Sequence, residues 1–268
     1  MATTHNKKEE LKQSFKDFLD KETLKLSDSI STSNGDWVVK GFIDVAKNIY
    51  TISIDTKVIS KVMELLIFPH ICSIAENNGY KWERCEEQNF YPDMTFIDKS
   101  GNKFAVDIKS SYRKNENSIN GMTLGAYTGY FRNRTSSKNV SYPYNDYVGH
   151  YVLGIIYSRS ADIPVEGKIY RLEDLKSISS VVNNVSFFVQ EKYKIASDKP
   201  GSGNTKNIGS ISDIKELIDG KGPFSSLGEK VFDDYWMFYL TNDMAKAAEL
   251  AKAPYSNLAQ FKSLKNIK

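Results

Sequence analysis

The sequence predicts a mixed α/β domain in which a central β-sheet is flanked by helices. Helical and strand patterns alternate along the 268 residues, and no internal repeat or low-complexity linker interrupts them. Hydrophobic residues make up 40% of the chain and aromatic residues 12%, which is enough to bury a sizeable core. The chain therefore fits one large folded domain or two small ones.

Composition and charge narrow the classes of protein that fit. The start, MATTHNKKEELKQ, is too polar for a secretory signal, and no apolar run approaches the length that spans a bilayer. We therefore expect a cytoplasmic protein without a membrane partner. The two cysteines, Cys72 and Cys85, lack CxxC spacing, which argues against a disulfide framework and a structural zinc site. The net charge of +3 suits a nucleic-acid partner only if the basic residues gather in a groove.

The spacing of apolar residues predicts helices at both ends of the chain. From Lys7 to Leu26 charged and apolar residues recur at helical spacing, which predicts an amphipathic, largely solvated capping helix. A second helix is expected from about Asp55 to Gly79, kinked or split at Pro69. In the tail, residues 210–220 predict a short capped helix, and residues 225–240 carry a helical aromatic stripe typical of a core or an interface.

Strand patterns fill the region between these helices. Residues 147–158 are apolar and rich in β-branched and aromatic side chains, which predicts a buried strand, and residues 185–197 predict another. Two shorter strands flank the turn residues 98–102, which predicts a β-hairpin. Residues 123–144 predict a helix followed by a basic loop, and residues 198–210 are irregular.

The hairpin concentrates charge on one face. Side chains alternate along a strand, so pairing Asp93 near Asp107 places both, with Thr95 and Lys109, on one face. The other face holds Met94, Phe96, Phe104, Val106 and Ile108. Two opposed carboxylates repel unless a cation lies between them, and Mg²⁺ takes one or two protein carboxylates together with phosphate oxygens. Lys109 would offer a positive charge to a phosphate or an attacking water. An ordinary amphipathic hairpin with solvent-facing ion pairs would show the same pattern.

Glu64 is a further acidic candidate. It lies among the apolar residues Val62 to Ile67 of the predicted helix, where a carboxylate costs free energy unless it is paired or binds a metal. A position at the edge of the helix, reaching solvent, explains it equally well.

These motifs resemble a known family. Pro92-Asp93 followed by Asp107-Ile108-Lys109 matches the signature of the PD-(D/E)xK nucleases, and the rest of the chain resembles the EcoRV family of type II restriction endonucleases. Matching segments keep the same order from about Thr51 to about Tyr239, among them 55–58, 88–89, 123–125, 201–205 and 207–210. The resemblance implies a restriction-endonuclease-like core with a mixed central sheet.

The resemblance also implies catalytic roles. Asp93 and Asp107 would hold Mg²⁺, Lys109 would orient or deprotonate the attacking water, and Glu64 would be an accessory acid near the metal. We expect residues 51–240 to form the catalytic and DNA-binding domain. Residues 1–50 would be a helical dimerisation extension, and residues 241–268 a helical tail packed on the same domain.

DNA contacts are implied in two loops and at scattered polar residues. The glycine-rich segment would read base edges in the major groove, because glycine lets the backbone approach closely and Asn pairs bidentately with adenine. This segment is Gly201, Ser202, Gly203, Asn204, Thr205, Lys206 and Asn207. A phosphate-cradling loop is the rival interpretation, but the P-loop ending Gly-Lys-Thr/Ser is missing. Gln88 and Asn89 would face the minor groove. Phosphate contacts are expected from Ser111, Lys57, Arg132 and Lys138, with solvated surface as the alternative.

The expected function is a Mg²⁺-dependent, sequence-specific endodeoxyribonuclease that acts as a homodimer on palindromic double-stranded DNA, because a two-fold protein presents the same loop to both half-sites. The resemblance of the glycine-rich segment implies the site GATATC or a close relative, cut to blunt ends, and a companion DNA methyltransferase. Two alternatives stay open: a structure-specific nuclease of the same fold, and a DNA-binding module without catalysis. A carbohydrate hydrolase with two carboxylates would have no use for Lys109.

Overall fold

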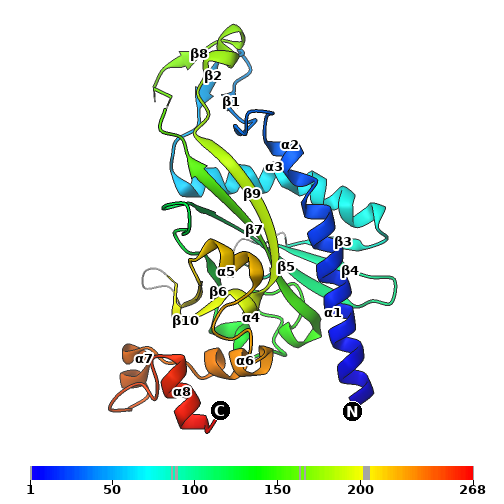
Figure 1. The fold of residues 1–268 in the computed structure, drawn as a ribbon, viewed down its shortest axis with the longest axis vertical. Helices are drawn as coiled ribbons and strands as arrows, with labels where there is room; N and C mark the ends of the chain where they lie inside the picture. The colour runs from blue at the N-terminus through cyan, green and yellow to red at the C-terminus, as the bar shows by residue number, and fades with distance from the viewer. Residues whose placement is uncertain are drawn as a thin grey trace.

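A five-stranded mixed sheet forms the centre of the molecule (Figure 1). Its order is β3-β4-β5-β7-β9, with the bounds Lys81–Arg84, Met94–Ile97, Lys103–Tyr112, Tyr147–Arg159 and Val182–Glu191. Strands β5 and β7 run parallel, and the other neighbouring pairs of this sheet are antiparallel. The computed structural model describes residues 2–85, 87, 90–162, 164–165, 167–201 and 206–267. The predicted mixed α/β class is confirmed.

The predicted hairpin consists of β4 and β5. The side chain of Asp98 accepts hydrogen bonds from the backbone N–H groups two and four residues further on, at 2.8 and 2.9 Å, which closes the turn. Met94 pairs with Val106, so Asp93, one residue earlier, reaches the position opposite Asp107. The predicted pairing is confirmed.

Helix α3, Thr56–Asn77, starts where the sequence predicts. Asp55 caps it by accepting hydrogen bonds from the N–H groups of Lys57 and Val58. The helix runs unbroken through Pro69, so the predicted split is wrong. By length and composition α3 passes for a membrane span, which corrects the expectation that no apolar run is long enough. The apolar side chains of this helix, however, pack in a core beside the central sheet, as in many folded domains.

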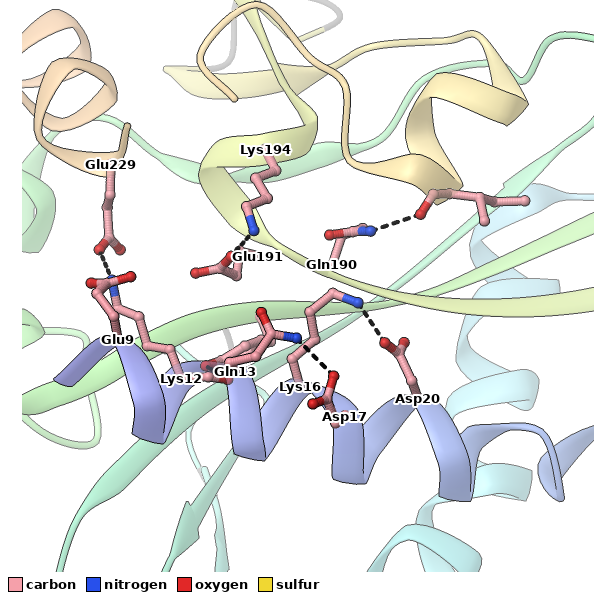
Figure 2. Close-up of polar contacts among 12 residues, drawn as sticks. Glu9, Lys12, Gln13, Lys16, Asp17, Asp20, Gln190, Glu191, Lys194 and Glu229 are labelled. Atoms are coloured by element: carbon pink, nitrogen blue, oxygen red, sulfur yellow. Dashed lines mark hydrogen bonds and ion pairs between the residues drawn. The ribbon is translucent and has the colours of Figure 1, made fainter. Parts of the chain in front are cut away.

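Helix α1, Ala2–Thr23, packs along the sheet and is followed by the short α2, Leu26–Ile30. The helix is confirmed, but the expectation of a solvated cap is wrong. Phe15 is 1% exposed and stacks on Phe104, with ring centroids 4.1 Å apart. Lys12 is buried too, and its ammonium lies 2.5 Å from Glu229 in the C-terminal part of the chain (Figure 2). The sequence pattern underestimated this helix because its lysine stems cover apolar surface.

Apolar cores cover both faces of the central sheet, which argues against the alternative of an ordinary hairpin with solvent-facing ion pairs. On one side Phe96 and Phe104 pack with residues of α1 and α3. On the other side Thr95 and Asp107 are only 1% and 4% exposed, because elements that follow β5 in the chain cover that face. Strand β5 lies in the interior of the sheet, where both faces are buried.

A second sheet has the order β10-β11-β6, with the bounds Ala196–Pro200, Asn207–Ser210 and Thr123–Ala126. It corrects the helix predicted in residues 123–144, which form β6 and the 3-10 helices η1, Gly129–Phe131, and η2, Tyr144–Asp146. Gly125 and Gly129 take positive φ angles of 91° and 58°, which an α-helix excludes.

The predicted strand 185–197 is shorter than expected, because β9 ends at Glu191 and one turn of helix, α4, Lys192–Ile195, leads into β10. Residues 198–210 contain more order than predicted, since β10 and β11 pair in antiparallel fashion on either side of the glycine-rich segment.

Four helices complete the described part of the chain: α5, Ile214–Asp219; α6, Glu229–Met237; α7, Asn242–Ala247; and α8, Leu258–Lys265. The predicted α5 is confirmed, with Asp213 as its cap and Gly220 in the left-handed conformation at its end. The aromatic stripe of α6 is confirmed as core, because Tyr235 and Trp236 have no exposed surface.

A third sheet, β1-β2-β8, lies at one end of the molecule, next to the ends of β7 and β9 (Figure 1). Its strands are Gly41–Ile43, Ile49–Thr51 and Ile169–Tyr170, and the 3-10 helix η3, Leu172–Ser177, follows. The sheet exposes the large apolar side chains of Phe42, Ile43, Tyr50 and Ile169, and η3 exposes those of Leu172 and Leu175.

Candidate active site

A cleft of about 670 Å³ brings together the acidic residues of the hairpin, helix α3 and the second sheet. Asp93, Asp107 and Lys109 line it, as predicted from their common strand face. The rest of the lining comes from Lys61, Glu64, Arg84, Cys85, Glu87, Phe90, Tyr91, Thr123, Gly125, Ala126, Tyr130 and Asn207. Residues separated by more than a hundred positions in the chain therefore share one opening.

Lys109 bridges the two carboxylates. Its Nζ lies 2.8 Å from Oδ2 of Asp107 and 3.2 Å from Oδ2 of Asp93. The backbone N–H of Ile108 also donates a hydrogen bond to Asp93 Oδ2, at 2.7 Å. These contacts hold the two acids at adjacent positions of the hairpin, where they would otherwise repel.

The environment separates the pKa values of the two acids. Burial, together with the neighbouring charge of Asp107, raises the pKa of Asp93 to about 6. Burial would also raise the pKa of Asp107, but the ammonium groups of Lys109 and Lys192 outweigh it and lower that pKa below the ordinary value. The pKa of Lys109 is raised despite burial, because Asp107 and Asp93 favour its charged form. In this state Lys109 is a cation and not a free base.

The acidic pair fits a hard divalent cation. A lysine ammonium already occupies the position between the two carboxylates, so the site attracts positive charge. Within the described ranges no group of three or more His, Cys, Asp or Glu side chains is arranged to hold a metal. The residues that would hold the cation here are the two acids Asp93 and Asp107. Two carboxylates with room for water and phosphate oxygens match Mg²⁺ better than they match Zn²⁺.

Glu64 lines the same cleft from α3 and is paired. Its Oε1 lies 2.7 Å from Nζ of Lys61 and 3.4 Å from the guanidinium of Arg84 on β3. A quarter of its side chain is exposed. Both sequence interpretations therefore hold in part, since the carboxylate is ion-paired and it also reaches solvent at the helix edge.

Only three of the nine residues predicted to contact bases lie within the described part of the chain. Asn207 lines the cleft, Gly201 lies at the end of β10, and the side chain of Lys206 is exposed. Six others lie outside the described residues: Gln88, Asn89, Ser202, Gly203, Asn204 and Thr205.

The four expected phosphate contacts differ in availability. Lys57 and Lys138 are exposed, although neither lines the cleft. Ser111 is buried and its hydroxyl donates to the carbonyl of Gly121, and Arg132 donates to the carbonyl of Tyr239. These hydrogen bonds favour a structural role for Ser111 and Arg132.

Three residues at or behind the cleft were not among the predicted site residues: Tyr91, Tyr130 and Lys192. The hydroxyl of Tyr91 is hydrogen-bonded to Nδ1 of His150 at 2.9 Å, and its ring stacks on that of Tyr130. Lys192 is 2% exposed. A signal was available for this lysine, because it lies within the predicted buried strand 185–197, where a lysine is unusual.

Two acids and a lysine on a hairpin of a mixed, helix-flanked sheet define the restriction-endonuclease-like class of nucleases. The family model described as restriction endonuclease EcoRV matches residues 33–266, which extends the expected resemblance at both ends. The type II restriction enzyme EcoRV of Escherichia coli is 38% identical over 241 residues, which cover 89% of this chain and 95% of that enzyme. The chain therefore belongs to the EcoRV family of restriction endonucleases and is a type II site-specific deoxyribonuclease. Nucleases of this kind generally depend on divalent metals.

Proposed function

We propose that this nuclease requires Mg²⁺ and cleaves palindromic double-stranded DNA as a homodimer, at GATATC or a close relative, leaving blunt ends. The observation that carries the proposal is the shared cleft. It unites the bridged acidic pair with Asn207, the last residue of the glycine-rich segment. Chemistry and base reading would then occur at one opening.

In this proposal the chain orients the reactants and compensates charge. Asp93 and Asp107 hold the cation, and Glu64 is an accessory acid that keeps Lys61 and Arg84 at the rim of the cleft. Mg²⁺ supplies Lewis-acid stabilisation of charge on the phosphate when bound. Lys109 stabilises charge at phosphorus and orients the water that attacks in line, and loss of the 3′ oxygen leaves 5′ phosphate and 3′ hydroxyl ends.

Base reading is assigned to Gly201, the segment 202–205, Lys206 and Asn207. Strands β10 and β11 anchor both ends of this segment, and β6 joins them to the cleft wall. Gln88 and Asn89 would contact the minor-groove side. Lys57 and Lys138 would contact phosphates. Ser111 and Arg132 are less available for such contacts, because their polar groups already have hydrogen-bond partners in the protein.

The third sheet supports the homodimer. Its exposed apolar side chains from β1, β2 and β8 form a surface of the kind that another protein subunit covers. A two-fold dimer through this surface would give each half-site its own cleft. A cytoplasmic location and a companion methyltransferase that protects host DNA follow from the restriction function.

A plasmid digest tests the proposal. Purified protein with Mg²⁺ should yield discrete fragments whose sequenced ends show GATATC halves and blunt cuts. Asp93→Ala should bind the same DNA and leave it intact. A smear, or cutting of branched DNA alone, would favour a structure-specific nuclease, and no cutting at all would favour a DNA-binding module.

Asn204→Ala tests base reading separately. An adenine-reading Asn contributes about 1–3 kcal/mol of discrimination between bases. The rate of cleavage at the specific site should therefore fall by about 10–100-fold. Binding to unrelated DNA, measured by gel shift, should change little. Equal losses on all sequences would show that this residue does not read bases.

A further inference from the structure

Lys192 has an unusual environment for a lysine. It is the first residue of α4, directly after β9, and its side chain is 2% exposed. Its Nζ is fully buried, and no hydrogen-bond acceptor for it exists among the residues that the structure describes. An ammonium in this position is costly, because burial removes its hydration without replacing it.

The ammonium of Lys192 lies directly behind the cleft wall. It sits over the ring of Tyr91, 4.6 Å from the centroid. A Cβ atom added to Gly125 would lie 3.3 Å from it, so the glycine leaves it room. Tyr91 and Gly125 both line the cleft together with Asp107. The cation therefore contacts residues of the wall of the cleft that holds the acidic pair.

The charges around Lys192 point to the acidic pair as its counterpart. Burial lowers the pKa of Lys192 to about 8, and the attraction of Asp107 opposes that change, so the ammonium stays mostly charged at neutral pH. The other acid nearby, Asp233, is already paired with Arg134 at 2.5 Å. Lys109 and Lys192 together thus balance the two carboxylates.

We propose that Lys192 is a positioning residue that balances the acidic pair from behind the cleft wall and weakens its hold on a divalent cation until DNA phosphate joins the site. The inference rests on the proposed nuclease function. The buried ammonium of Lys192 destabilises the folded protein. In return it provides the two acids with a permanent positive charge that lies outside the position of the divalent cation. A DNA phosphate brings the negative charge that makes full cation binding favourable.

The variant Lys192→Met tests the inference, because methionine fills similar space without charge. Calorimetry with the full-length protein and Mg²⁺, without DNA, should show binding about 3- to 10-fold tighter than for the wild type. Thermal unfolding in EDTA should occur at the same or a higher temperature, since the unsolvated charge is gone. Cation binding in this variant should no longer depend on bound DNA. The rate of single-turnover cleavage should therefore fall.

Lys194→Met is the matched control. Lys194 lies on the same turn of helix, but its ammonium pairs with Glu191 and is not part of the cleft lining. Mg²⁺ binding by this variant should equal that of the wild type. Lys192→Gln, which is neutral and can hydrogen-bond, provides a second variant if the methionine protein does not fold.

The possible results separate this inference from the proposed function. If the folded Lys192 variants bind Mg²⁺ as the wild type does, or more weakly, the inference is overturned while wild-type cleavage still supports the nuclease. A wild type that neither binds Mg²⁺ nor cleaves DNA overturns both. Tighter binding in the Lys192 variants alone is the result expected, since a purely structural lysine would loosen the site when removed.

Discussion

At the scale of single residues, Asp93 and Asp107 carry the same side chain in different surroundings. Asp93 has the raised pKa because burial and the neighbouring charge of Asp107 together outweigh the attraction of Lys109. Asp107 is more deeply buried, yet it stays ionised because two ammonium groups face it. The site therefore holds one firmly charged acid and one that titrates near neutrality.

The raised pKa of Asp93 should make the stability of the metal-free protein depend on pH. The folded state keeps a proton that the unfolded chain releases, so this contribution is full below about pH 4 and is lost as pH rises through about 6. It amounts to at most about 3 kcal/mol, and to less because a third of the side chain is exposed. In the Asp93→Asn variant this pH-dependent loss in the free energy of unfolding should be absent. Urea unfolding of both proteins in EDTA at acidic and neutral pH measures it. A difference between wild type and variant that is the same at acidic and neutral pH would contradict it.

Removal of Lys109 should leave the acidic pair without its bridge. We expect Lys109→Met to lower the free energy of unfolding by roughly 2 kcal/mol in EDTA and to abolish cleavage. Added Mg²⁺ should restore more stability to this variant than to the wild type, because it replaces the lost cation. Denaturant titrations with and without Mg²⁺ measure this, and equal gains in both proteins would argue against a cation site at the acids.

At the scale of elements, α1 joins two parts of the molecule that are far apart in the chain. Phe15 enters the core beside the sheet, and Lys12 pairs with Glu229 on α6 (Figure 2). The hydroxyl of Tyr151 on β7 also donates to the carbonyl of Lys12, at 2.9 Å. The helix therefore positions the C-terminal part against the central sheet.

Lys12→Met should destabilise the protein by roughly 1–3 kcal/mol, since Glu229 loses its partner in a partly buried position. The double variant Lys12→Met with Glu229→Gln should recover part of the loss, because the partly buried carboxylate is then gone too, and Glu9, the other partner of Lys12, is half exposed. Thermal unfolding of the four proteins of this cycle measures the coupling. Additive losses would mean that the pair does not join α1 to α6.

At the scale of the whole molecule, the apolar surface of the third sheet predicts association. Ile43→Asp should weaken the proposed dimer by at least about tenfold, since a charge would be buried at the contact. Cleavage of both strands should fall with it. Leu264→Asp is the control, because Leu264 is exposed to a similar extent on α8 at the other end of the molecule. Sedimentation of the variants decides, and an undiminished dimer in Ile43→Asp would place the interface elsewhere.

Several features followed from sequence because they depend on neighbouring residues. The turn at Asp98 and the two-residue alternation along β4 and β5 are local, so they predicted that Asp93, Asp107 and Lys109 share a face. The cap at Asp55 and the aromatic stripe of α6 are local in the same sense. Errors arose in residues 123–144, where positive φ angles at glycines overrode a helical composition.

The sequence by itself determined the nuclease motif, its hairpin and its family, because strand alternation, turn chemistry and residue order are written along the chain. Only the tertiary structure decided that Glu64 pairs with Arg84, that α1 belongs to the core, and that Lys192 stands behind the acids. Each of these is a contact between residues that are distant in sequence. Burial and electrostatic balance depend on such contacts, and no local pattern specifies them.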